Sequence, residues 1–130
     1  MKLMLIIEFE EEVRAWMHAC FGKEILNDIT ERNYRFLEES LELVQSLGCT
    51  KEDALKLVDY TFSRPKGNPH QEIGGVMVTL AALCSAYGED LELCSEDELA
   101  SVWRKIDQIR QKHQNKPVKS PLPGKTTTNE

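Results

Sequence analysis

The chain has 130 residues, 41% of them apolar, with only 7 Gly and 5 Pro, which is enough material for one packed core and not for two. Its net charge is −6, and because the segment 115–130 carries +2, the remaining body carries −8. Such an acidic body repels a polynucleotide backbone, so we expect no polymeric nucleic acid among its partners.

The N-terminal seven residues are apolar except for Lys2 and run directly into the acidic stretch 8–12, which is too short and too acidic a combination for a signal peptide. No apolar run approaches the roughly 20 residues that cross a bilayer, so we expect a cytoplasmic protein with no membrane partner. The four cysteines form no CxxC pair, and we predict reduced, mostly buried thiols. These cysteines are Cys20, Cys49, Cys84 and Cys94.

Helical periodicity covers most of the chain and predicts an all-α fold. A first helix is expected over about residues 8–21, where Gly22 ends it. A second helix begins near Thr30, a suitable N-cap, and closes before Gly48.

Thr50, followed three residues later by Asp53, predicts the start of a third helix that runs to about Phe62. Two prolines and one glycine within residues 64–69 then predict a loop. The fourth helix, about residues 71–87, is apolar nearly all round, so we expect it to be the central and most buried element.

Ser95 and Glu98 form a capping box that predicts a fifth helix ending near His113. We therefore expect an all-α fold with a four-helix-bundle core and an extra N-terminal helix in residues 1–114, followed by a disordered basic and Pro-rich tail, 115–130. Because the fourth helix needs cover on every side, we also expect a homodimer or a homotetramer.

Carboxylates on the predicted helices suggest a metal site. Glu38, Glu39 and Glu42 share one sector of the second helix, since each residue advances by about 100°. Glu72 opens the fourth helix, and Asp59 stands among apolar neighbours on the third. Hard cations such as Mg²⁺ or Mn²⁺ take oxygen ligands, and two such ions about 3.5–4 Å apart activate a water for phosphate hydrolysis. By pattern alone, a solvated helix face is the commoner meaning of such a cluster.

Two segments resemble the ExxE…ExxD signature of the MazG-like nucleoside triphosphate pyrophosphohydrolases. They are RFLEESLEL, residues 35–43, and EIGGVMVTL, residues 72–80. The resemblance spans roughly residues 8–112 and is strongest to small phage-type members that act on purine deoxynucleotides. It implies an all-α pyrophosphohydrolase, located in the host cytoplasm if the chain is phage-encoded.

In this resemblance Glu39 and Glu42 fill the ExxE positions and Glu72 the first position of ExxD. Gly75 stands where the family has a metal-binding aspartate. Either Asp59 or Glu38 supplies the missing carboxylate, or the metal count and the activity differ from those of the family.

The resemblance implies hydrolysis of purine dNTPs (dGTP or dATP) to the monophosphate and pyrophosphate, with two or more Mg²⁺ or Mn²⁺ ions per site. Glu39 and Glu42 are then the catalytic residues, and the metal ligands are Glu38, Glu39, Glu42, Asp59 and Glu72. The candidate substrate-binding residues are Trp16 and Asn68 for the base and Arg32, Arg64, Lys66 and Lys105 for the phosphates. For each cation, an ordinary surface charge is the alternative, and for Trp16 a place in the core.

Two other functions remain open at the level of the sequence. Gly75 favours a catalytically silent helical interaction module, which binds a partner and turns over no triphosphate. Alternatively, the same bundle is a phosphohydrolase for a different nucleotide, such as a nucleoside diphosphate. An active enzyme would either clean the deoxynucleotide pool or supply a monophosphate.

Overall fold

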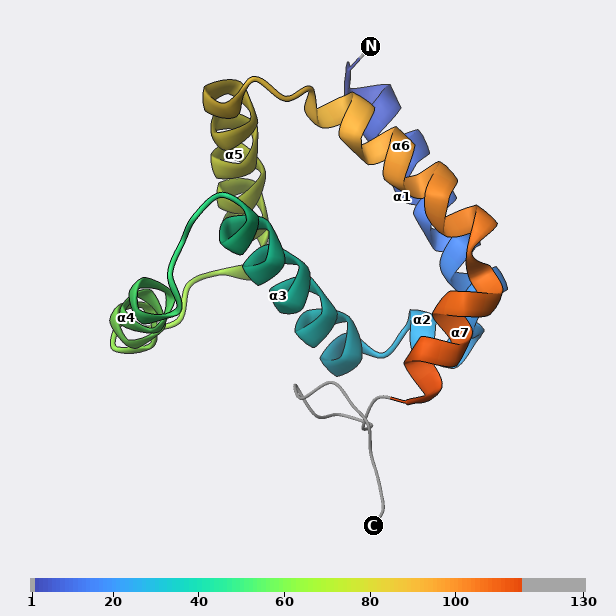
Figure 1. Cartoon of the computed structure of the whole chain (residues 1–130), viewed down its shortest axis with the longest axis horizontal. Helices are drawn as coiled ribbons and strands as arrows, with labels where there is room; N and C mark the ends of the chain where they lie inside the picture. The colour runs from blue at the N-terminus through green and yellow to red at the C-terminus, as the bar shows by residue number, and fades with distance from the viewer. Residues whose placement is uncertain (1, 116–130) are drawn as a thin grey trace. The chain divides into compact units, whose positions relative to one another are not determined.

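The computed structural model describes the backbone of residues 2–115 and the side chains of residues 6–115, and over this range it is helical (Figure 1). The helices are α1 (Lys2–Phe21), α2 (Lys23–Leu26), α3 (Ile29–Ser46), α4 (Lys51–Phe62), α5 (Pro69–Tyr87), α6 (Leu91–Arg104) and α7 (Ile106–Gln114). This confirms the all-α prediction. The predicted disordered tail lies, from residue 116 on, outside the described residues.

The chain divides into two units. Unit 1 comprises Met1–Glu39 together with Ser95–Glu130, and unit 2 comprises Ser40–Cys94. The four-helix bundle expected from the sequence draws its helices from both units and stays a prediction. Among the described residues, no helix combines the length and the apolar character that crossing a membrane requires.

Several helix ends lie where the sequence places them. The Thr50 hydroxyl accepts a hydrogen bond from the Asp53 N–H at 3.1 Å and so caps α4, as predicted. Gly22, Gly48 and Gly88 follow helices with φ of 91°, 98° and 84°. Only glycine adopts this left-handed region without strain, which is why the chain turns at these positions.

The start of α3 differs from the prediction. Asp28, not Thr30, is the cap, because its Oδ1 accepts a hydrogen bond from the Glu31 N–H at 3.1 Å. The helix therefore begins at Ile29. Both side chains suit an N-cap, and the aspartate also places a negative charge at the positive end of the helix.

The predicted fifth helix is two helices. Asp90 caps α6 by accepting a hydrogen bond from the Leu93 N–H at 3.0 Å, so Ser95 lies inside the helix and the capping box proposed there is wrong. Lys105, with φ −111° and ψ 25°, separates α6 from α7. Its N–H donates to the Val102 carbonyl at 3.2 Å, three residues back, which tightens the last turn of α6.

Unit 1 has a small closed core in which α1 packs against α2 and α7. Met17, Cys20 and Leu99 are its buried apolar residues. The guanidinium of Arg110 on α7 donates to the carbonyls of Ala19 at 2.6 Å and Cys20 at 2.7 Å. These carbonyls end α1 and have no partner inside the helix, so Arg110 satisfies them from outside.

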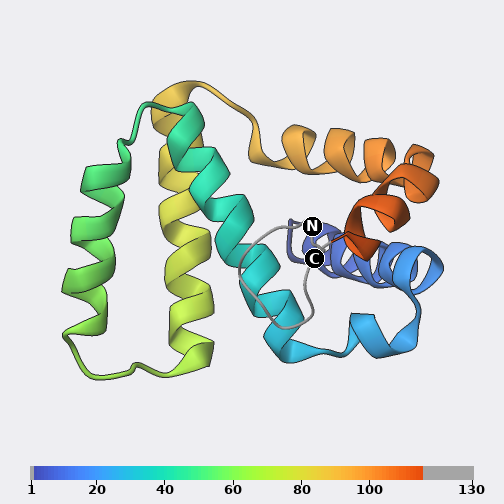
Figure 2. The ribbon, with the colours of Figure 1, turned by 60° about the horizontal axis from the view of Figure 1, so that its bottom comes forward.

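Unit 2 contains the C-terminal part of α3, the helices α4 and α5 joined by the loop 63–68, and the start of α6 (Figure 2). None of its side chains is buried. The prediction that α5 is the most buried helix is therefore wrong for a single chain, because most of its apolar side chains are exposed. The cysteines follow the same division: all four are free thiols, but only Cys20, in unit 1, is buried.

Candidate functional site

The ExxE glutamates lie on one uninterrupted helix. Because α3 is continuous from Ile29 to Ser46, Glu39 and Glu42 stand about one turn apart, and both side chains are exposed. Glu38 has a different environment, since its Oε1 accepts from Arg35 Nη1 at 3.2 Å. This ion pair already compensates the Glu38 carboxylate, which favours Asp59 over Glu38 as the replacement for the missing aspartate.

Three acidic residues of unit 2 have no such compensation. Glu42, Asp59 and Glu72 are exposed, and among the described residues their carboxylates form no ion pair. Their oxygen atoms are the donors that Mg²⁺ and Mn²⁺ prefer. Within residues 2–115, however, no three His, Cys, Asp or Glu side chains come close enough together to hold a metal ion. These oxygen donors therefore suit such a cation, but within the described residues of a single chain they do not lie close together.

The loop before α5 positions Glu72. Asn68 Oδ1 accepts hydrogen bonds from the N–H groups of His70 at 2.9 Å and Gln71 at 3.3 Å, and Pro69 occupies the first helical position, where no N–H is needed. The Glu72 side chain folds back against Gly67, so closely that a Cβ at Gly67 would overlap its carboxylate. The amide oxygen of Asn68 is thus occupied in the helix cap, and its role in reading a base stays a prediction.

Two of the candidate phosphate-binding cations lie in or beside the same loop. The Arg64 guanidinium lies over the Tyr60 ring, 4.4 Å from its centroid, and Lys66 is exposed. The ring orients the guanidinium without neutralising its charge. The segment 64–72 therefore presents two cations and one uncompensated carboxylate, Glu72, within nine residues.

Trp16 and Lys105, both in unit 1, have structural contacts. Trp16 Nε1 donates to the Val102 carbonyl on α6 at 3.0 Å, and its ring meets Phe21 edge-to-face at 5.6 Å. Lys105 lies at the break between α6 and α7, where its carbonyl accepts from the Ile109 N–H at 2.9 Å. Base stacking by Trp16 and phosphate binding by Lys105 stay predictions.

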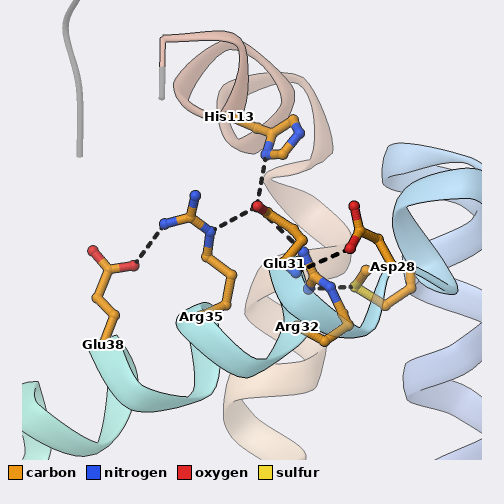
Figure 3. A network of polar contacts seen from close by, with 7 residues as sticks. Asp28, Glu31, Arg32, Arg35, Glu38 and His113 are labelled. Atoms are coloured by element: carbon orange, nitrogen blue, oxygen red, sulfur yellow. Dashed lines mark hydrogen bonds and ion pairs between the residues drawn. The ribbon is translucent and has the colours of Figure 1, made fainter. Parts of the chain in front are cut away.

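Glu31 forms the centre of a buried ionic cluster in unit 1 (Figure 3). The residue is only 4% exposed. Its Oε2 lies 2.8 Å from Arg35 Nε, 3.7 Å from Arg32 Nη2 and 3.8 Å from His113 Nδ1. We call these four residues the Glu31 cluster. A carboxylate this buried is costly unless cations and hydrogen bonds surround it, and the cluster provides both.

The two arginines of the Glu31 cluster experience opposing effects. Burial lowers the pKa of Arg32, and the negative charge of Glu31 only partly offsets this. Burial also acts to lower the pKa of Arg35, but hydrogen bonds and the charges of Glu31 and Glu38 outweigh it and raise that pKa. Among the described residues Arg32 Nε and Arg35 Nη2 are buried without a hydrogen-bond partner. The Arg32 charge is thus engaged inside the fold, which argues against its predicted phosphate role.

The sequence analysis missed the Glu31 cluster. It assigns no role to Glu31, and it names His113 only as the end of the predicted fifth helix. The one sequence signal is the pair Glu31 and Arg35, four residues apart on a helix, which is the spacing of a helical salt bridge. His113 is 82 positions further along the chain, so no local pattern connects it to Glu31.

Comparison with known proteins supplies no relative for this arrangement. No protein-family model, curated protein or solved structure matches the chain. The resemblance to MazG-like enzymes therefore stays a prediction from the two motif segments, and so do the residue roles that it implies.

Proposed function

We propose that this protein is a cytoplasmic nucleoside triphosphate pyrophosphohydrolase that acts on purine dNTPs with Mg²⁺ or Mn²⁺ and functions as a homo-oligomer. One observation carries this proposal: Glu42, Asp59 and Glu72 bear exposed carboxylates that no cation compensates among the described residues, whereas Glu31 and Glu38 are ion-paired. Glu42 and Glu72, together with Glu39, are also the residues that match the pyrophosphohydrolase signature.

The proposed reaction adds water across the bond between the α and β phosphates. Of the two phosphates that this bond joins, one takes the hydroxyl group of the water and the other takes the proton, so the products are the monophosphate and pyrophosphate. Bound divalent cations would supply Lewis-acid stabilisation of the phosphate oxygens. Glu39, Glu42 and Glu72 would hold these cations, with Asp59 completing the set because Glu38 is paired with Arg35.

The substrate phosphates need cationic partners from the protein. Arg64 and Lys66 fit this role best, because both belong to the segment that carries Glu72 and neither forms an ion pair among the described residues. Arg64 would bind a phosphate through two N–H groups, in the geometry that guanidinium prefers. Lys66 would act as a more mobile point charge.

The direct test is to incubate the purified full-length chain with each common dNTP and NTP and either Mg²⁺ or Mn²⁺, and then to separate the products. We expect the monophosphate and pyrophosphate, fastest with dGTP or dATP, and no product after chelation of the metal. Release of orthophosphate would instead support a phosphohydrolase of different specificity.

A catalytically silent interaction module is the second candidate. Gly75 favours it, because a glycine supplies no carboxylate at the position where the pyrophosphohydrolase signature has a metal-binding aspartate. The absence of any product with all nucleotides and both metals would support this function over hydrolysis.

A further inference from the structure

Arg64, in the loop that joins α4 to α5 (Figure 2), differs from Arg35 and Arg110 of unit 1. The guanidinium groups of those two arginines donate to carboxylates or carbonyls and are engaged inside the fold. Arg64 instead stacks on Tyr60, with 4.4 Å between its Cζ and the ring centroid. Among the described residues its guanidinium makes no hydrogen bond and no ion pair, so its five N–H donors are available to a ligand.

The stacking occupies one face of the guanidinium and leaves its edge open. A guanidinium attracts an aromatic ring through its face, whereas its N–H groups point outward in its own plane. Arg64 can therefore donate two parallel hydrogen bonds to a phosphate while it remains stacked on Tyr60. An unrestrained arginine loses side-chain freedom when it binds a ligand, so a ring that already restrains Arg64 lowers this entropic cost.

The backbone around Arg64 is held as well. The Arg64 N–H donates to the Thr61 carbonyl at 3.2 Å, and the Ser63 hydroxyl donates to the Tyr60 carbonyl at 2.7 Å. Both hydrogen bonds continue the last turn of α4, and Arg64 lies four residues after Tyr60, which brings ring and guanidinium to the same side. Lys66 follows two residues later and is exposed. Two cations so close along the chain suit a ligand with several linked phosphates.

We propose that Tyr60 is a positioning residue for the phosphates of the substrate: it touches no phosphate itself, and it holds the Arg64 guanidinium in place to bind them. This inference rests on the proposed function, since the ligand is the triphosphate group of a purine dNTP. The ring restrains Arg64 equally in the substrate complex and in the transition state. Loss of the ring should therefore weaken binding and leave the chemical step unchanged.

The test first measures binding without catalysis, by calorimetric titration of the whole chain with tripolyphosphate or dGTP in the presence of a chelator. Tyr60→Leu removes the ring, and both ligands should bind roughly twofold to fivefold more weakly, which is the size of an exposed cation–π interaction. Tyr60→Phe keeps the ring and should bind like the wild type. Tyr87→Leu is the control, because Tyr87 is 64% exposed against 58% for Tyr60, but among the described residues no cation lies over its ring.

The second measurement is steady-state kinetics with dGTP and Mg²⁺. Tyr60→Leu should raise KM by the same twofold to fivefold at unchanged kcat, and Tyr60→Phe should restore KM. A third measurement depends on no variant: in the wild type, the NMR signal of the Arg64 Nε–H group should shift when tripolyphosphate is added. The absence of this shift overturns the inference even if Tyr60→Leu fails to fold.

Other results also overturn the role of Tyr60. If Tyr60→Leu weakens the binding of dGTP but not of tripolyphosphate, the ring acts on the base and not on the phosphates. A wild type that binds no tripolyphosphate overturns the inference whatever its activity. A wild type that binds tripolyphosphate with the expected dependence on Tyr60, yet releases no pyrophosphate from any dNTP, refutes the proposed reaction and leaves the role of Tyr60 in phosphate binding intact.

Discussion

Glu31 in unit 1 is 4% exposed and lies within 4 Å of three cationic or titratable nitrogen-bearing side chains, whereas Glu42, Asp59 and Glu72 in unit 2 are exposed and unpaired among the described residues. A buried carboxylate has to be compensated by the protein itself, because water cannot reach it. An exposed and uncompensated one can take a cation from solution. Glu31 therefore stabilises the fold, whereas the carboxylates of Glu42, Asp59 and Glu72 are available for ligands.

The largest expected effect is the loss of activity in Glu42→Gln. This variant removes a proposed metal ligand at nearly constant volume, and we expect kcat/KM for pyrophosphate release to fall more than about 100-fold, since even outer-shell partners of metal ligands contribute 10–100-fold. The thermal midpoint should stay equal or rise, because no ion pair is lost. Glu52→Gln, an exposed glutamate of α4 outside the motif, is the control and should keep full activity. Unfolding of Glu42→Gln would show that Glu42 is structural.

Glu31→Gln should have the opposite result, with a large effect on stability. The variant leaves Arg35 and Arg32 without their buried anion, and we expect the free energy of unfolding to fall by about 3 kcal/mol. Glu38→Gln is the matched control, because Glu38 contacts the same Arg35 but its side chain is 31% exposed. Its loss should cost no more than about 0.5–1 kcal/mol. Urea unfolding measures both, and equal losses would contradict the distinction between the buried and the exposed pair.

The sequence predicts those features of the fold that depend on neighbouring residues. The Thr50 cap and the turn at Gly48 are local, since each is decided by atoms within a few residues. The errors arise where two acceptable caps compete. Asp28 and Thr30 are both suitable N-caps for α3, but only one side chain can accept hydrogen bonds from the first free N–H groups of the helix. In the structure this side chain is Asp28, and helical periodicity does not predict which of the two it is.

Contacts between distant segments could not be predicted in the same way. The contact of Glu31 with His113 depends on α7 returning to the start of α3, which no motif encodes. The composition of α5 indicates that it needs cover but not what provides it, so a burial prediction for this helix fails in a single chain. For the candidate site, the sequence identifies the residues that carry carboxylates. Whether these carboxylates lie close together depends on how the helices pack.

Gly75→Asp should raise the affinity of the proposed metal site. Position 75 lies one turn after Glu72 on α5, and a Cβ there meets no atom within 4 Å, so the aspartate fits without strain. We expect Mn²⁺ affinity to rise about tenfold, as one more carboxylate joins the set. Gly74→Asp is the control, because it has equally open space but points about 200° away from Glu72 around the helix. Equal affinity in the two variants would contradict a site at Glu72.

The smallest expected effect comes from Gly67→Ala, which tests whether the loop orients Glu72. The added Cβ would occupy the place of the Glu72 carboxylate, and since that group is the end of a flexible side chain, it rotates away at little cost. The free energy of unfolding should therefore change by less than about 0.5 kcal/mol. Mn²⁺ affinity should fall by roughly threefold to tenfold, because a displaced ligand has to be reoriented before it binds. Gly74→Ala adds the same methyl group in open space, so it should leave the affinity unchanged, and an equal decrease in both variants would assign the effect to the backbone rather than to the position of Glu72.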